Sequence, residues 1–181
     1  IFLIICVFML RWSTDKDKSI KEKVSALFEL PQMVKPPKIA DSYTFAGEKV
    51  PMNVDTRERI ERELLTNSYY HNATTWALKR HRQYFPLIEK VLKENGVPED
   101  FKYLAVAESN LMNATSTAGA KGVWQFMTPT AKEFGLRVDT EVDERYHVEK
   151  STEAAAKYLK QLKNMTGNWV NAAAAYNVGP G

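Results

Sequence analysis

The apolar residues of this 181-residue chain recur mainly at helical spacing. Over residues 98–112 they return every three or four positions, as on one face of an α-helix. Pro98 suits the first turn of such a helix, and Glu99 and Asp100 complement the positive end of its dipole. This segment is predicted to be the central helix, with an inward stripe of Phe101, Leu104, Ala105, Leu111 and Met112.

Two helices are predicted before the central one. Asp55, with a glutamate three positions later, forms a capping box for a helix over residues 55–67. A longer helix covers residues 74–95, and its inward face is predicted to include Trp76. Pro86 falls inside this second helix and is expected to kink it or to mark a junction.

The remaining pattern is also helical. A short helix is predicted over residues 128–135, and Ser151 is predicted to cap a longer one. The last helix, residues 169–176, carries small alanines that should let it pack against the central helix. Residues 43–52 are predicted to be an extended strap outside any sheet. The fold class is therefore all-α.

Composition limits the class of protein. A hydrophobic content of 44% suits one domain with a core, and a net charge of +3 gives no case for nucleic acid binding. Cys6 is the only cysteine, so no internal disulfide is possible. The three histidines are scattered without the spacing of metal ligands. We expect no metal, no cofactor and a monomer.

The first residues suggest export. Residues 1–12 contain an apolar run that is too short to span a bilayer but suits the end of a signal peptide or membrane anchor. Residues 13–42 have the composition of a linker. We expect an exported protein of the periplasm or cell envelope, with the membrane as a possible partner through this N-terminal segment.

Glu108 occupies the apolar stripe of the central helix, where a core residue would normally lie. A carboxyl group among apolar side chains resists ionisation, so its pKa rises and it holds a proton near neutral pH, as a general acid must. The alternative is an ordinary helix residue whose carboxylate reaches water or pairs with a lysine.

The segment after Glu108 adds a second signal. Gly119 and Gly122 allow tight backbone turns, and Trp124 and Gln125 follow them directly. Sugar rings stack on aromatic side chains, and sugar hydroxyl and acetamido groups bond to neutral amides. The combination favours a carbohydrate site.

Three ordered motifs carry a family resemblance: Glu108-Ser109, Ser116 to Met127, and Ala175 to Gly179. Together they resemble the motifs of the family 1 lytic transglycosylases, which cut bacterial peptidoglycan. The variant Gly122-Val123-Trp124-Gln125, in place of the commoner Gly-Leu-Met-Gln, is similar to the membrane-bound transglycosylase D type, whose members often carry LysM modules. The resemblance implies a lysozyme-like helical domain, related to goose-type lysozyme, over residues 43–181 and truncated at its C-terminus.

The resemblance also implies a mechanism with one catalytic acid. Glu108 would protonate the bond between N-acetylmuramic acid and N-acetylglucosamine and then act as base, giving a 1,6-anhydro product from glycan strands of peptidoglycan. By motif, the substrate-binding residues would be Ser109, Ser116, Gln125, Met127, Tyr176 and Asn177.

Two other functions stay open. A lysozyme-type hydrolase needs a second carboxylate, and Glu133, Asp139, Glu141 and Asp143 lie in the right half of the chain but on no apolar stripe. A non-catalytic wall-binding module would keep the aromatic residues but has no use for a half-buried Glu108.

Overall fold

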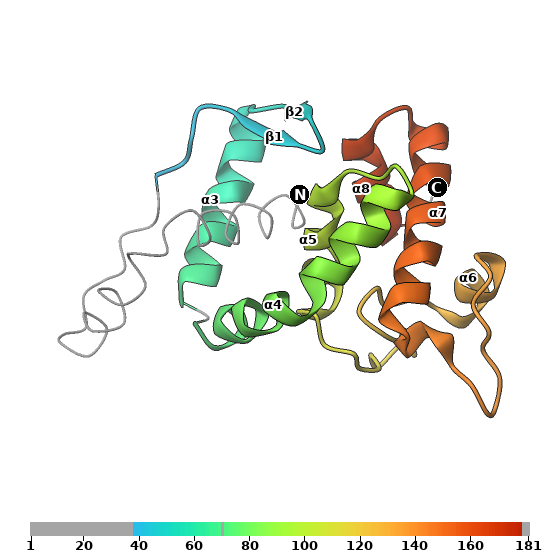
Figure 1. The fold of residues 1–181 in the computed structure, drawn as a ribbon. Coiled ribbons are helices and arrows are strands. Elements are labelled where there is room, and N and C mark those ends of the chain that lie inside the picture. Colours follow the sequence, from blue (N-terminus) through green and yellow to red (C-terminus); the bar gives the residue numbers. More distant parts are fainter. Residues whose placement is uncertain (1–37, 70, 179–181) are drawn as a thin grey trace.

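The computed structural model describes residues 38–69 and 71–178, and its architecture is helical (Figure 1). Helices pack on helices, and a short antiparallel hairpin lies at one edge. The prediction of an all-α domain is confirmed, whereas residues 1–12 and most of the predicted linker lie outside the described residues. The elements in order are β1 Tyr43–Phe45, β2 Glu48–Val50, α3 Val54–Tyr69, α4 His71–Glu94, η1 Glu99–Phe101, α5 Lys102–Ser109, α6 Thr128–Glu133, η2 Glu144–Tyr146, α7 Val148–Thr166 and α8 Trp169–Val178.

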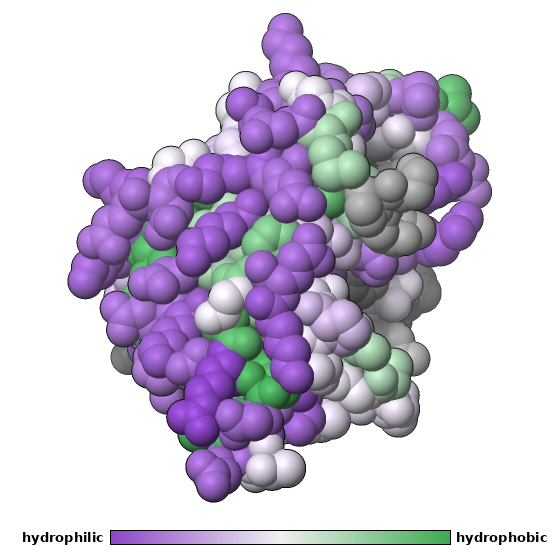
Figure 2. Space-filling model, turned by 90° about the vertical axis from the view of Figure 1, so that its right-hand side faces the viewer, coloured by the Kyte–Doolittle hydropathy of each residue, from purple (hydrophilic) through white to green (hydrophobic). Residues whose placement is uncertain are grey.

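Helix α7 supports the core from one side. It packs against both α4 and α8, through a buried face that includes Ala154, Ala155 and Ala156. Small side chains let the neighbouring helices approach closely. The side of the molecule formed by α6 and α7 is mainly hydrophilic (Figure 2), so α7 is buried on one face and solvated on the other.

The last helix has a different main partner from the one predicted. Helix α8 lies chiefly along α7, while α5, which carries Glu108, lies against α4. Ala172 and Ala173 are both buried, so the small residues do permit close packing. The helix that carries them packs along α7 and not broadly against α5.

Helix α7 begins earlier than predicted. His147 is its N-cap, and the ring Nδ1 accepts a hydrogen bond from the Lys150 backbone N–H. Ser151 is already inside the helix and fully buried, and its hydroxyl donates to the Val148 carbonyl. The Ser151 cap is therefore wrong, because a histidine side chain took the role that sequence rules assign to serine.

Helix α4 stays continuous through Pro86 and changes direction along its length (Figure 1). The prediction that Trp76 is a core residue is wrong, because its side chain is 47% exposed. Ala77, one position later, is buried instead. The Trp76 ring lies under the charged groups of Lys79 and Arg80, at 4.9 and 5.4 Å from its centroid, so cations cover part of it at the surface.

The extended strap is in fact a β-hairpin. Strands β1 and β2 pair in antiparallel register, with Tyr43 opposite Val50. The two turn residues, Ala46 and Gly47, have φ angles of 53° and 79°, the left-handed conformation that a tight two-residue turn requires. Alanine rarely adopts this conformation, which is why the sequence gives no hairpin signal.

Two helix ends also differ from the predictions. Asn53 caps α3 by accepting from the Thr56 N–H, so the Asp55 capping box is wrong. Helix α5 ends at Ser109, because Asn110 and Leu111 both take left-handed φ angles of 50° and 56°. Met112, predicted to be inward, is consequently 44% exposed.

Candidate active site

Glu108 lies in the last turn of α5, on the helix face that the buried Leu104 and Ala105 begin. Among the side chains that the structure describes, its Oε1 is the only fully buried oxygen or nitrogen without a hydrogen-bond partner. Burial raises the pKa of this carboxyl from 4.5 to about 6. Glu108 therefore has the environment of a group that holds a proton at mildly acidic pH and can give it up.

Tyr176, on α8, is the titratable neighbour of Glu108. Its hydroxyl donates a hydrogen bond of 3.0 Å to the backbone carbonyl of Trp124. Burial, and then the charge on Glu108, raise the pKa of the phenol well above its usual value. The phenol accordingly stays neutral, and the charge on Glu108 opposes its ionisation.

An aromatic cluster surrounds the Tyr176 ring. Its centroid lies 6.4 Å from that of Trp124, 6.3 Å from that of Phe126 and 5.1 Å from that of Tyr158. These rings come from the loop after α5 and from α7. Helix α8 is therefore joined, close to the acid, both to the loop that follows α5 and to α7.

The loop over residues 113–127, called the site loop below, is closed by hydrogen bonds within its own backbone. Lys121 and Phe126 exchange two hydrogen bonds of 3.1 Å, and Gly122 donates to the Ala114 carbonyl at 3.0 Å. Gln125 adopts a left-handed φ of 50°, and its side-chain amide donates to the carbonyls of Gly122 and Ala114. These bonds fix the loop as a compact turn against the end of α5.

Arg145 fastens this loop to the rest of the domain. It is 3% exposed, and its guanidinium donates to the carbonyls of Gly119 and Phe126 and to both oxygens of Asp143. Asp143 also pairs with Lys121 at 3.1 Å, and these partners hold the pKa of its carboxyl well below its usual value. Arg145 lies two residues after Asp143 in a charged segment, and its contacts with the loop give it a scaffold role.

The residues named by motif take different positions around the site. Ser109 is nearly buried, and its hydroxyl lies 3.0 and 2.9 Å from the carbonyls of Ala105 and Val123. Ser116 accepts from the Ala120 N–H. Met127 is 44% exposed, and Asn177 is exposed too. The two serines and Gln125 thus bond to backbone, whereas Met127 and Asn177 are open to a ligand.

Trp124 is not the sugar platform that its position suggested. It is fully buried, and its indole N–H donates to the Thr152 hydroxyl at 2.8 Å. The residue joins the loop after α5 to α7, and it meets Tyr176 through both its carbonyl and its ring. A sequence cannot separate the two roles, because an aromatic residue beside glycines suits both a core and a sugar surface.

The four acids considered as a second carboxylate differ in their hydrogen bonds, ion pairs and exposure. Asp139 bonds to Arg137 and to the N–H groups of Glu141 and Val142, and these lower its pKa. Asp143 is tied to Arg145, and the Glu141 side chain is 82% exposed. Glu133 is exposed on α6. Burial, and then the charge on Glu133, raise the pKa of Tyr158, so Glu133 lies near the aromatic cluster.

Metal binding has no support in residues 38–69 and 71–178, where no three His, Cys, Asp or Glu side chains gather closely enough to hold an ion. Glu108, with its raised pKa, is the group there that is suited to proton transfer, and the neutral phenol of Tyr176 is its neighbour.

Comparison with known proteins points in the same direction. Residues 85–181 match the model of the transglycosylase SLT domain. The chain is 32% identical over 147 residues to membrane-bound lytic murein transglycosylase D of Escherichia coli (strain K12), which covers 78% of the chain and 32% of that protein. It is 40% identical over 102 residues to peptidoglycan transglycosylase gp16 of Escherichia phage T7, covering 54% of the chain and 8% of that protein.

A third relative bears a different kind of name. The chain is 30% identical over 115 residues to a putative tributyltin chloride resistance protein of Alteromonas sp. (strain M-1), covering 62% of the chain and 56% of that protein. The chain spans about a third of the length of the transglycosylase D protein.

Proposed function

Since the chain belongs to the transglycosylase SLT domain family, we propose that it is a lytic transglycosylase of peptidoglycan. It cleaves the β-1,4 bond between N-acetylmuramic acid and N-acetylglucosamine and leaves a 1,6-anhydromuramic acid end. The observation that carries the proposal is the buried, unpartnered Oε1 of Glu108. An acid in that environment costs stability, and general acid chemistry accounts for its presence.

The reaction uses the same carboxyl twice. Protonated Glu108 gives its proton to the glycosidic oxygen, the bond to C1 of the muramic acid breaks, and the N-acetylglucosamine hydroxyl leaves. The 2-acetamido group of the substrate stabilises the positive charge at C1. Glu108, now a carboxylate, takes the proton from the C6 hydroxyl, and the C6 oxygen bonds to C1. Glu108 ends protonated, and no water is consumed.

Surrounding residues hold this acid in place and form the edge of the site. Neutral Tyr176 lies near Glu108 and is anchored on the Trp124 carbonyl, so it limits hydration of the carboxyl without competing for its proton. Exposed Met127 and Asn177 are positioned to meet the glycan. Ser109, Ser116 and Gln125 act through the backbone that they bond.

A lysozyme-type hydrolase is the second candidate, and the position of Glu133 is what favours it. Such an enzyme needs a second carboxylate to hold water or to attack C1. Glu133 is the exposed acid whose charge reaches Tyr158, which in turn contacts Tyr176. By contrast, Asp139 and Asp143 are held by ion pairs with arginines.

The products distinguish the two reactions. Purified peptidoglycan digested in water labelled with heavy oxygen should yield muropeptides with 1,6-anhydro ends, lighter by one water than hydrolytic products and free of the label. Glu133→Gln should leave both rate and product unchanged. Two results together would move the assignment to a hydrolase: labelled reducing ends from the unmodified protein, and loss of activity in Glu133→Gln.

The pH dependence should follow Glu108. The active form carries the proton, and its pKa of about 6 means that this form is lost as the pH rises above that value. We expect kcat/KM to fall by roughly tenfold per pH unit on the alkaline side of about 6. A rate that stays flat from pH 5 to pH 8 would exclude Glu108 as the acid; a circular dichroism signal at each pH is the control for folding.

The place of action follows from the substrate. Peptidoglycan glycan strands lie in the bacterial cell envelope, so we place the protein there. Within residues 38–69 and 71–178, no helix has the length and apolar content needed to cross a membrane.

A further inference from the structure

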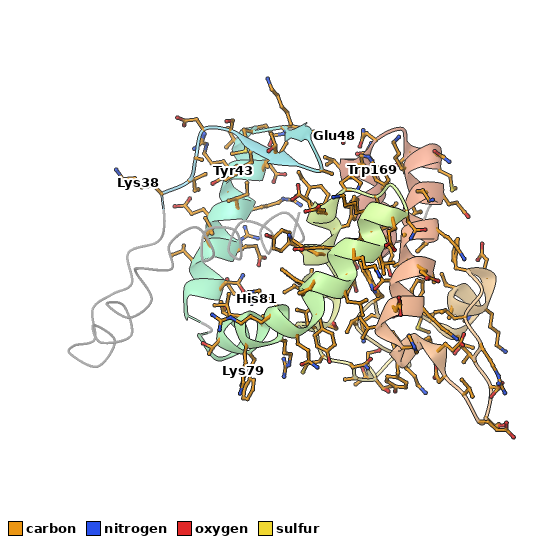
Figure 3. The ribbon with its side chains drawn as sticks, viewed as in Figure 1. Lys38, Tyr43, Glu48, Lys79, His81 and Trp169 are labelled. Carbon is orange, nitrogen blue, oxygen red and sulfur yellow. The ribbon has the colours of Figure 1, made fainter. Side chains whose placement is uncertain are left out.

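The hairpin over residues 43–50 contacts the starts of both helices that carry the proposed site. Helix α8, which carries Tyr176, begins at Trp169, and η1 leads from Asp100 into α5, which carries Glu108. Figure 3 shows Glu48 of the hairpin beside Trp169, away from His81 and Lys79 on α4. The hairpin thus bridges two elements that are far apart in the sequence.

Glu48 caps α8 with both of its carboxylate oxygens. Oε1 accepts from the Trp169 N–H at 2.9 Å, and Oε2 accepts from the Val170 N–H at 3.0 Å. The first N–H groups of a helix have no acceptor inside it, and the start of a helix attracts negative charge. One side chain from a hairpin distant in the sequence therefore fixes the position and direction of the first turn of α8.

The same hairpin is bonded to the start of the acid-bearing segment. The Ala46 N–H in the hairpin turn donates to Asp100 Oδ2 at 2.8 Å. Beneath these polar contacts, the rings of Phe45 and Phe101 lie 5.1 Å apart and those of Phe101 and Trp169 lie 5.3 Å apart, each pair edge to face. Polar and aromatic contacts thus connect hairpin, η1 and α8 as one rigid unit.

The site residues lie at matching distances from this unit. Tyr176 is about two helical turns after Trp169, and Glu108 is about two turns after Asp100. Short helices move as rigid bodies, so a shift at their starts is transmitted to both side chains. The relative position of Glu108 and Tyr176 consequently depends on how the hairpin holds the two starts.

We propose that residues 43–50 act as a positioning clamp for the reaction, with Glu48 as the positioning residue that sets Tyr176 beside Glu108. The role rests on the proposed transglycosylase function. Glu48 lies at the far end of α8 from Tyr176 and does not itself touch the glycan. Its effect is on the chemical step, because a misplaced neighbour of the acid weakens catalysis even when the substrate still binds.

The test compares two helix caps, of which only one belongs to a helix that carries a site residue. Glu48→Ala removes both acceptors from α8, while the Asn168 side chain still accepts from the Asn171 N–H, so the helix keeps one cap. Asn53→Ala removes the cap of α3, which carries no site residue. Both variants should lose a few degrees of Tm. Only Glu48→Ala should lower kcat, by roughly tenfold, with KM little changed.

A double-mutant cycle separates positioning from general loosening. If Glu48 acts through Tyr176, then Glu48→Ala should lower kcat much less in a Tyr176→Phe background than in the unmodified protein. Glu48→Gln, which keeps one accepting oxygen, should give an intermediate kcat and a protein that folds if the alanine variant does not. Equal kcat for Glu48→Ala and Asn53→Ala, or fully additive effects in the cycle, overturn the clamp. Failure of the transglycosylase proposal is read separately, from the product of the unmodified protein.

Discussion

Replacing Glu108 by glutamine is expected to lower turnover by about 10²–10⁴-fold, the usual cost of losing a general acid. Glutamine keeps the size and the hydrogen-bonding shape of the side chain but cannot donate a proton to the glycosidic oxygen. Binding of glycan should survive, because Met127 and Asn177 are untouched. Turnover of purified peptidoglycan and the affinity for glycan chains should be measured on the same preparation.

Glu108→Gln should raise the stability of the protein while it lowers turnover, and the gain in stability should depend on pH. The pKa of Glu108 is raised from 4.5 to about 6, so between these values the native state binds more protons than the unfolded state. Stability from this group is therefore highest below pH 4.5 and declines as the pH rises through about 6. Glu108→Gln should be up to about 1–2 kcal/mol more stable at pH 7.5, allowing for partial hydration, and equal at pH 4.

Glu133→Gln is the matched control, because it makes the same chemical change at an exposed acid near the aromatic cluster. It should alter neither turnover nor the pH dependence of Tm. A Glu108→Gln protein that binds glycan, is stable and turns over at the normal rate would remove the proposed mechanism. Lower stability with unchanged activity per folded molecule would mean that Glu108 has a structural role.

Long elements of this fold are predictable because their periodicity is repeated many times. Helices α4 and α7 extend over several turns, so their existence follows from the pattern even where one residue, such as Trp76, is assigned to the wrong face. Short elements have no such repetition. The hairpin depends on Ala46 in a left-handed conformation, and the start of α7 depends on a histidine cap, and both are choices that local preference disfavours.

The site was predictable to the extent that its signal is local. Glu108 is an acid on an apolar stripe, and that stripe is visible within one helix. The burial of Trp124 and the role of Arg145 depend on contacts with segments far along the chain, namely Thr152 for the indole and the carbonyls of Gly119 and Phe126 for the guanidinium. No spacing rule reports such contacts, so these two roles appear only in three dimensions.

The two glycines of the site loop provide the second large effect. Both have left-handed backbones, with φ of 86° at Gly119 and 80° at Gly122. A Cβ at Gly119 would meet nothing within 4 Å, whereas a Cβ at Gly122 would lie 1.9 Å from the Arg145 carbonyl oxygen. Gly119→Ala should therefore cost only backbone strain, about 1–2 kcal/mol. Gly122→Ala should bring the same strain and, in addition, a clash with backbone.

Gly122→Ala should consequently destabilise the protein by about 3–5 kcal/mol, in the range of severe core substitutions. To relieve the clash, the loop would have to move away from the Arg145 backbone carbonyl. The Arg145 side chain opposes that movement, because it is bonded to Gly119 and Phe126 on the same loop. Both variants carry the same backbone strain. The difference between their free energies of unfolding, measured in urea, is therefore the cost of the clash. Equal losses for the two variants would contradict the close packing of Gly122 on Arg145. Turnover per folded molecule should also fall only in Gly122→Ala, because a displaced loop moves the Trp124 carbonyl that anchors Tyr176 beside Glu108.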